Sequence, residues 1–131
     1  MNVKKMLRPF AVALGLLFAM SSAWAGLTTN NAVYIAGSNP GSAYGNINAA
    51  RFSSDSTQYI GCSVFPSSNL GVTQTSCYAK NSAGTYMTCN STSPVIAQIA
   101  ASIGSTSYLW FTVTNGSCTY LNVDNWSAPV R

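Results

Sequence analysis

The sequence predicts a mainly β protein: a small antiparallel β-sandwich or open barrel with one short helix and two disulfides. Three observations lead to this fold class. Short segments rich in β-branched and aromatic residues alternate with clusters of Gly, Pro, Asn and Ser, as strands alternate with turns. A single segment, about 94–103, has helical periodicity. Four cysteines in a chain that begins with an export signal predict disulfide bonds.

Residues 1–25 have the features of a secretory signal peptide. A positively charged start precedes an apolar segment, residues 10–20, which is too short to span a bilayer. The small-x-small cleavage site Ala-Trp-Ala follows at residues 23–25. We therefore expect residues 26–131 to form a single β-rich domain that is secreted, periplasmic or at the cell surface. No membrane span is expected after the signal is removed.

Five strands are predicted before the helix, separated by turn clusters. The segment 44–52 is the weakest of them, because its Gly, Asn and Ala content suits a sheet edge or a bulge. In the turn at 81–84, Gly84 suits the left-handed position that ends a type I turn. A three-residue loop there would place Cys77 opposite Cys89, whereas a four-residue loop would turn them to opposite faces. The predicted strands are 28–36, 44–52, 57–65, 72–80 and 85–90.

The helix is predicted to begin after Ser93, a favourable N-cap residue, with Pro94 at its first position. Gly104 suits the position just after its end. A stripe of apolar residues recurs with helical spacing and should cover a sheet. This stripe consists of Ile96, Ile99, Ala100 and Ile103.

The strongest hairpin signal is Asn115-Gly116 between two apolar runs within 106–123, because both turn residues need a positive φ. A two-residue turn fixes the register. Both faces then carry large apolar groups. One interpretation is a central hairpin with one face in the core and the other partly covered; another makes Tyr108, Trp110 and Leu121 an exposed aromatic platform. The expected pairs are Thr114–Ser117, Val113–Cys118, Phe111–Tyr120, Leu109–Asn122, Thr112–Thr119, Trp110–Leu121 and Tyr108–Val123.

The cysteines, Cys62, Cys77, Cys89 and Cys118, are expected to form two disulfides. Spacing does not fix their pairing. We favour Cys62–Cys77 and Cys89–Cys118, because this pairing joins elements that would otherwise be held by packing alone. No metal site is expected, since the chain has no Cys-x-x-Cys motif and no histidine.

Without the signal peptide the chain is nearly uncharged. Arg51, Lys80 and Arg131 stand against Asp55 and Asp124, a formal net charge of +1 compared with +4 for the whole chain. Three scattered cations are too few for a nucleic-acid footprint. A neutral surface rich in hydroxyl and amide groups suits contacts with sugars, with a polymer or with another copy.

The residues present also restrict catalysis. Without histidine, Ser/His/Asp and Cys/His nucleophile systems are excluded. A hydrolase would need Asp55 and Asp124 in one cleft. We expect each of these carboxylates to cap a turn instead. The sequence therefore predicts a protein that is not an enzyme and carries no cofactor.

Several motifs between residues 51 and 129 resemble those of a group of small exported, four-cysteine bacterial proteins of unknown function. This resemblance implies an exported, cystine-bearing module and supplies no catalytic residues. The motifs are Arg51-Phe-Ser-Ser-Asp-Ser, Gln58-Tyr-Ile-Gly-Cys62, Cys77-Tyr-Ala, Cys89-Asn-Ser, Gly116-Ser-Cys118 and Ser127-Ala-Pro.

Together these features favour an exported, non-enzymatic β-module that binds a glycan or envelope polymer through exposed aromatic residues. The chief candidates are Tyr108, Trp110 and Tyr120. The alternative is a structural subunit that associates with itself through sheet edges, because few charges protect those edges. The wider pool of candidate aromatics is Tyr34, Tyr44, Tyr59, Tyr78, Tyr86, Tyr108 and Trp110.

Overall fold

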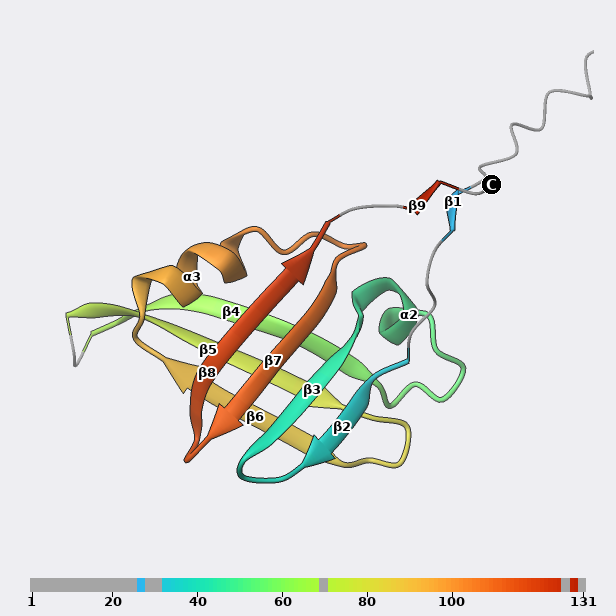
Figure 1. Ribbon diagram of the computed structural model, residues 1–131, viewed down its shortest axis with the longest axis horizontal. Helices are drawn as coiled ribbons and strands as arrows, with labels where there is room; N and C mark the ends of the chain where they lie inside the picture. The colour runs from blue at the N-terminus through green and yellow to red at the C-terminus, as the bar shows by residue number, and fades with distance from the viewer. Residues whose placement is uncertain (1–25, 28–31, 69–70, 126–127, 130–131) are drawn as a thin grey trace, which may run out of the picture. The chain divides into compact units, whose positions relative to one another are not determined.

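The computed structural model describes residues 26–27, 32–68, 71–125 and 128–129 (Figure 1). The predicted signal peptide, residues 1–25, lies outside this part of the chain. The described chain is mainly β, with two short helices. The elements are β1 (Gly26–Leu27), β2 (Tyr34–Gly37), β3 (Gly41–Asn46), α2 (Ile47–Arg51), β4 (Tyr59–Ser67), β5 (Val72–Lys80), β6 (Tyr86–Ser91), α3 (Pro94–Ala101), β7 (Tyr108–Thr114), β8 (Ser117–Asp124) and β9 (Ala128–Pro129).

Seven strands form one curled sheet, a half-barrel, in the order β2-β3-β7-β8-β6-β5-β4. β1 and β9 form a separate two-stranded sheet. All neighbours in the large sheet are antiparallel except β6 and β8, which run parallel and share one register pair, Asn90 and Ser117. This narrow seam divides the sheet into a four-stranded half, β2-β3-β7-β8, and a three-stranded half, β6-β5-β4. The predicted open-barrel class is thereby confirmed.

The chain crosses between the two halves twice, and each crossing contains a helix (Figure 1). α2 lies in the crossing from β3 to β4 and packs against both strands. α3 lies in the crossing from β6 to β7 and packs against β4, β5 and β8. Each helix therefore packs against strands of both halves. These contacts help to hold the halves together, because the seam itself has a single register pair.

The core lies between the inner faces of the two halves. Alternate residues of β7 point inward, and Leu109 and Phe111 are fully buried. β5 contributes Cys77 and Ala79 from the other half, and α3 contributes Ile96. Burial of one large apolar side chain contributes about 1.5–3 kcal/mol, so these inner faces supply most of the cohesion.

The predicted helix is present with its predicted cap, but it ends early. The Ser93 hydroxyl accepts a hydrogen bond from the Ile96 amide, and Pro94 occupies the first turn. α3 ends at Ala101 and not at residue 103, so the predicted role of Gly104 as its terminal glycine is wrong. The Gly104 amide instead donates to the Ser107 hydroxyl at 2.8 Å, which ties the loop to β7.

The predicted extended segment 44–52 is wrong beyond Asn46. The Asn46 side chain accepts a hydrogen bond from the Ala49 amide at 3.1 Å and starts α2. Ala49 and Ala50 favour a helix, and Ala50 is buried against the core. Here an N-cap residue followed by alanines outweighs the strand-like pattern.

The two disulfides have the predicted pairing, Cys62–Cys77 and Cys89–Cys118. The first links neighbouring strands of the three-stranded half. The second joins β6 to β8 and therefore links the two halves across the seam. The three-residue loop after Asn81, with Gly84 at φ +84°, places Cys77 and Cys89 opposite each other in the β5–β6 ladder, so all four cysteines lie in one row across the sheet.

Candidate functional site, an exposed aromatic face

A β-bulge in the main hairpin decides which side chains of β8 face the solvent. The Asn115-Gly116 turn and the first two pairs, Thr114–Ser117 and Val113–Cys118, agree with the predicted register. A shift then occurs between Thr112 and Val113, which leaves Thr119 as the extra residue. The five remaining predicted pairs are therefore wrong by one residue: the structure pairs Thr112 with Tyr120, Phe111 with Leu121, Trp110 with Asn122, Leu109 with Val123 and Tyr108 with Asp124.

The bulge separates apolar side chains from aromatic ones. Leu121 faces the core and is 4% exposed, so the prediction that it belongs to an exposed platform is wrong. Tyr120 faces the solvent at 45% exposure and lies beside Trp110, with ring centroids 5.6 Å apart. If Thr119 were paired in a regular ladder and not bulged, the alternation of β8 would have placed Tyr120 inside and Leu121 outside.

Five aromatic side chains lie together on the outer surface of the four-stranded half. Tyr34, Tyr44 and Trp110 are register partners on β2, β3 and β7, and cross-strand partners on one face are close neighbours. The ring centroids are 5.1 Å apart for Tyr34–Tyr44 and 6.4 Å apart for Tyr44–Trp110. We call the set Tyr34, Tyr44, Tyr108, Trp110 and Tyr120 the aromatic face.

The rings of the aromatic face hold one another in place while remaining accessible. Trp110 meets the Tyr44 and Tyr120 rings edge to face, at interplanar angles of 68° and 69°. Such pairs are each worth about 0.5–1.5 kcal/mol beyond their buried area. Trp110 is nevertheless 43% exposed and Tyr34 is 53% exposed. A contiguous exposed aromatic patch of this kind is characteristic of a binding surface.

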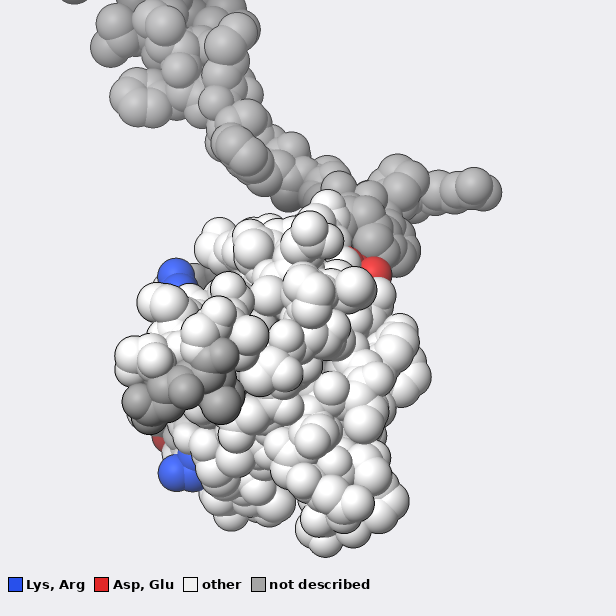
Figure 2. Space-filling model, turned by 90° about the vertical axis from the view of Figure 1, so that its left-hand side faces the viewer, with Lys and Arg blue, Asp and Glu red and all other residues white. Residues whose placement is uncertain are grey.

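The aromatic face has one charged neighbour, Asp124, which is the register partner of Tyr108. Tyr108 is partly buried, and desolvation, the neighbouring Tyr44 and the carboxylate of Asp124 together raise the pKa of its phenol above 10. The Tyr108 phenol is therefore neutral at physiological pH. Figure 2, which views the molecule from one side, shows charged side chains as isolated spots on a surface that is otherwise uncharged.

The other predicted aromatics do not join this face. Tyr59 and Tyr86 form a separate pair, with centroids 6.4 Å apart, on the three-stranded half. They flank Lys80, which is the register partner of both. Tyr78 is half-buried on β5. The structure thus brings together the three chief candidates, Tyr108, Trp110 and Tyr120, and adds Tyr34 and Tyr44 from the wider pool.

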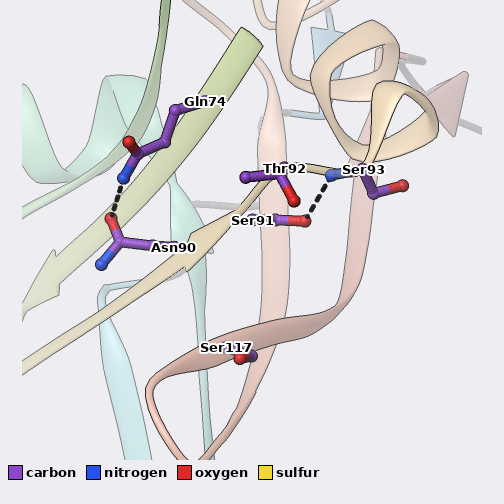
Figure 3. A pocket seen from close by; sticks show the side chains of 6 residues that line it. All are labelled: Gln74, Asn90, Ser91, Thr92, Ser93 and Ser117. Atoms are coloured by element: carbon purple, nitrogen blue, oxygen red, sulfur yellow. Dashed lines mark hydrogen bonds between the residues drawn. The ribbon is translucent and has the colours of Figure 1, made fainter. Parts of the chain in front are cut away.

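A second surface of interest is a polar groove of about 460 Å³ at the seam between the halves (Figure 3). Its lining side chains are all neutral amides and hydroxyls. Two internal hydrogen bonds hold part of it: the Gln74 amide donates to the Asn90 carbonyl oxygen at 3.4 Å, and the Ser93 backbone N–H donates to the Ser91 hydroxyl at 3.1 Å. The lining residues are Gln74, Asn90, Ser91, Thr92, Ser93 and Ser117.

The two carboxylates occupy separate places in the fold. Asp55 lies in the loop between α2 and β4 and caps its own turn, as predicted: one of its oxygens accepts from the Thr57 and Gln58 amides at 2.8 and 3.1 Å. These bonds, with the Gln58 side chain, lower the pKa of Asp55 below 3.8. Asp124 lies at the end of β8, opposite Tyr108. The pocket beside Asp55 is lined by residues near α2 and does not include Asp124.

The cysteines offer no free thiolate. The sulfurs of Cys77, Cys89 and Cys118 lie within 4.8 Å of one another, a spacing that could suit a metal ion. All four cysteines are bonded in disulfides, and a metal requires deprotonated thiols. The row of cysteines is therefore a structural element in this oxidised form.

Searches against protein-family models, curated proteins and solved structures found no match to this chain. Within the described residues, neither helix has the length and hydrophobicity to cross a bilayer.

Proposed function

We propose that the protein is an exported, non-enzymatic module that binds a neutral polysaccharide, such as an envelope or extracellular glycan, through the aromatic face. The observation that carries this proposal is the contiguity of five aromatic rings from four adjacent strands with little charge around them. Aromatic faces carry partial negative charge and therefore attract the C–H groups on the faces of sugar rings. Rigid Tyr and Trp side chains also lose little entropy when they bind.

The charge distribution favours a neutral sugar polymer over a nucleic acid. Nucleic-acid bases also stack on aromatic residues, but their backbone requires a positively charged track. Two cations lie in the described residues: Arg51 is the last residue of α2, and Lys80 is the last residue of β5. Neither α2 nor β5 contributes to the aromatic face. A neutral polymer needs no such cations.

The proposed location follows from the covalent chemistry. Two disulfides indicate an oxidising compartment. On the basis of the predicted signal peptide, we propose that the protein is secreted, periplasmic or at the cell surface. Membership in the exported four-cysteine group stays a prediction.

Retention on insoluble polysaccharides tests this function. The oxidised protein, residues 26–131, is incubated with cellulose, chitin, starch and peptidoglycan, and the bound fraction is measured. We expect retention on at least one of them and its loss in Trp110→Ala. Tyr86→Ala removes an aromatic side chain that is at least as exposed as Trp110 and belongs to the separate Tyr59–Tyr86 pair. This variant should bind like the wild type. Equal retention of Trp110→Ala, or no retention on any polymer, would contradict the proposal.

One observation supports the alternative, self-association through a sheet edge. β4 is an edge strand of nine residues without a charged side chain, and Val64 and Phe65 on it are exposed. Uncharged edges are prone to pair with other strands. Multi-angle light scattering over a wide concentration range measures this directly. We expect concentration-dependent growth in mass that Val64→Lys suppresses; a constant monomer mass would remove the alternative.

A further inference from the structure

The aromatic face has a direction, because its rings follow one another across the sheet. Tyr34, Tyr44, Trp110 and Tyr120 come from β2, β3, β7 and β8, which are consecutive neighbours in the sheet. The successive centroid distances are 5.1, 6.4 and 5.6 Å. Three inter-strand spacings correspond to about 14 Å, which is much longer than one sugar ring. A ligand that touches all four rings must therefore be a chain.

The aromatic face is also open at both ends. Its two terminal rings are both accessible, since Tyr34 is 53% exposed and Tyr120 is 45% exposed, and neither lines the pockets described above. On one side the row ends at Tyr34 on the edge strand β2. Recognition of a chain end requires a pocket that encloses it. An open row instead accepts an internal stretch of a chain that continues past both ends.

A line of hydroxyl groups runs beside the aromatic row. Ser42 lies two residues from Tyr44 on β3 and is the register partner of Thr112, which lies two residues from Trp110 on β7. The Thr112 hydroxyl contacts the Thr119 hydroxyl at 2.8 Å, so the bulge residue extends this line onto β8. Residues two apart share a face of the sheet. Because Tyr120 is the register partner of Thr112, the row of rings turns toward this line at β8. The surface thus presents aromatic rings and, beside them, groups that donate and accept hydrogen bonds.

We propose that the aromatic face binds an internal segment of an extended, neutral polysaccharide that lies across β2, β3, β7 and β8. Successive sugar rings contact the aromatic row, and their hydroxyls bond with Ser42, Thr112 and Thr119. This inference rests on the proposed function and adds to it the form of the ligand. The bulge has two roles in this arrangement, because it brings Tyr120 to the surface and supplies Thr119 to the hydroxyl line.

Chain-length dependence tests the inference. The probes are oligomers of one to six units of β-1,4-glucose, α-1,4-glucose and β-1,4-N-acetylglucosamine, with calorimetry as the measurement. We expect affinity to rise with each added unit up to three or four units and then to level off. Reduction of the terminal sugar should leave the affinity of the longer oligomers unchanged, since no end is recognised.

Two variants locate the chain on the face. Trp110→Ala interrupts the middle of the row and should weaken binding of the longest oligomer about tenfold or more. Tyr34→Ala removes the terminal ring, so affinity should level off one unit earlier and fall only severalfold. Tyr86→Ala is the matched control, and thermal unfolding confirms that each variant is folded.

The outcomes separate this inference from the proposed function. Retention on a polymer together with full affinity for a single sugar, or strict dependence on an intact chain end, would overturn the extended-chain inference and leave the function in place. Equal effects of Tyr34→Ala and Trp110→Ala on the length at which affinity levels off would also overturn it. Absence of retention on every polymer would instead overturn the function.

Discussion

The two halves of the sheet bury similar inner faces but are held together differently. The four-stranded half relies on long backbone ladders and aromatic contacts, and contains no disulfide between its own strands. The three-stranded half contains the Cys62–Cys77 bridge and has a polar outer surface near the seam. The Cys89–Cys118 bridge crosses the seam, where pairing is weakest, whereas the Cys62–Cys77 bridge lies within the complete β4–β5 ladder. Neither bridge joins two strands of the half that carries the aromatic face. Substitutions at particular bridges and side chains test this contrast.

The largest effect is expected from loss of the disulfide across the seam. The chain-entropy model assigns about 3.6 kcal/mol to a bridge with the 29-residue separation of Cys89–Cys118, and about 3 kcal/mol to the 15-residue Cys62–Cys77 bridge. The seam has one register pair, whereas Cys62 and Cys77 lie in a complete ladder. The double alanine variant at Cys89 and Cys118 should therefore unfold at a clearly lower denaturant concentration than the variant at Cys62 and Cys77. Equal midpoints would argue against a special role for the seam.

Truncation of Leu121, the side chain that the bulge turns into the core, should be next in size. Leu121 is 4% exposed, and loss of a buried apolar side chain of this size corresponds to about 1.5–3 kcal/mol, so Leu121→Ala should lower the free energy of unfolding by that amount. Deletion of Thr119 is the counterpart: Tyr120 then follows Cys118 directly, and regular alternation keeps Tyr120 outside and Leu121 inside. The deletion should therefore cost less than Leu121→Ala in chemical denaturation. A larger loss from the deletion would show that the bulge itself is required for the packing of β8.

A smaller change, this time a gain in the free energy of unfolding, is expected from a substitution inside the three-stranded half. Thr75 is fully buried, and its hydroxyl has no hydrogen-bond partner among the residues that the structure describes. Thr75→Val keeps the shape and removes the unsatisfied group, so it should raise the free energy of unfolding by about 1 kcal/mol. Thr88→Val is the counterpart: its hydroxyl donates to the Cys77 carbonyl at 2.9 Å, and its loss should be destabilising. Destabilisation by Thr75→Val would mean that the hydroxyl has a partner.

The smallest effect is a pH dependence of stability that arises at Asp55, in the connection between β3 and β4. The pKa of Asp55 is lowered below 3.8 by hydrogen bonds from Thr57 and Gln58. Its contribution to stability is therefore present above the unfolded pKa and is lost as the pH falls through the lower folded value. Asp55→Asn should melt slightly below the wild type at neutral pH, and the difference should disappear in acid. Ser54→Ala, in the same loop, should show no such pH dependence.

Local signals in the sequence were sufficient for much of the fold. The strand 72–80, the turn at Asn115-Gly116 and the Ser93 cap were predicted correctly because each depends on neighbouring residues alone. α2 was missed because its strand-like composition outweighed the Asn46 cap. The bulge at Thr119 could not be predicted, since it depends on whether Leu121 or Tyr120 fits the core, which is a property of the whole fold.

In the candidate site too, local features could be predicted from the sequence and long-range contacts could not. Trp110, Tyr108 and Tyr120 could be predicted because they belong to one strong hairpin. Their meeting with Tyr34 and Tyr44 depends on the placement of β3 beside β7, two strands far apart in the sequence. The pairing of Tyr34 with Tyr44 could have been inferred from the Gly37–Gly41 turn, because that hairpin fixes them as partners.

The crowded row of cysteines has a consequence for any preparation of this protein. Cys77 and Cys89 face each other on adjacent strands, although each is bonded to another partner. Oxidation in the wrong order could join these two and leave Cys62 and Cys118 to pair elsewhere. If Cys62 and Cys118 then bond to each other, the isomer has the mass of the correct product and no titratable thiol, yet its bridge between the halves joins β4 to β8 in place of β6 to β8. Peptide mapping of the bridges, and not a thiol assay, is the appropriate quality control.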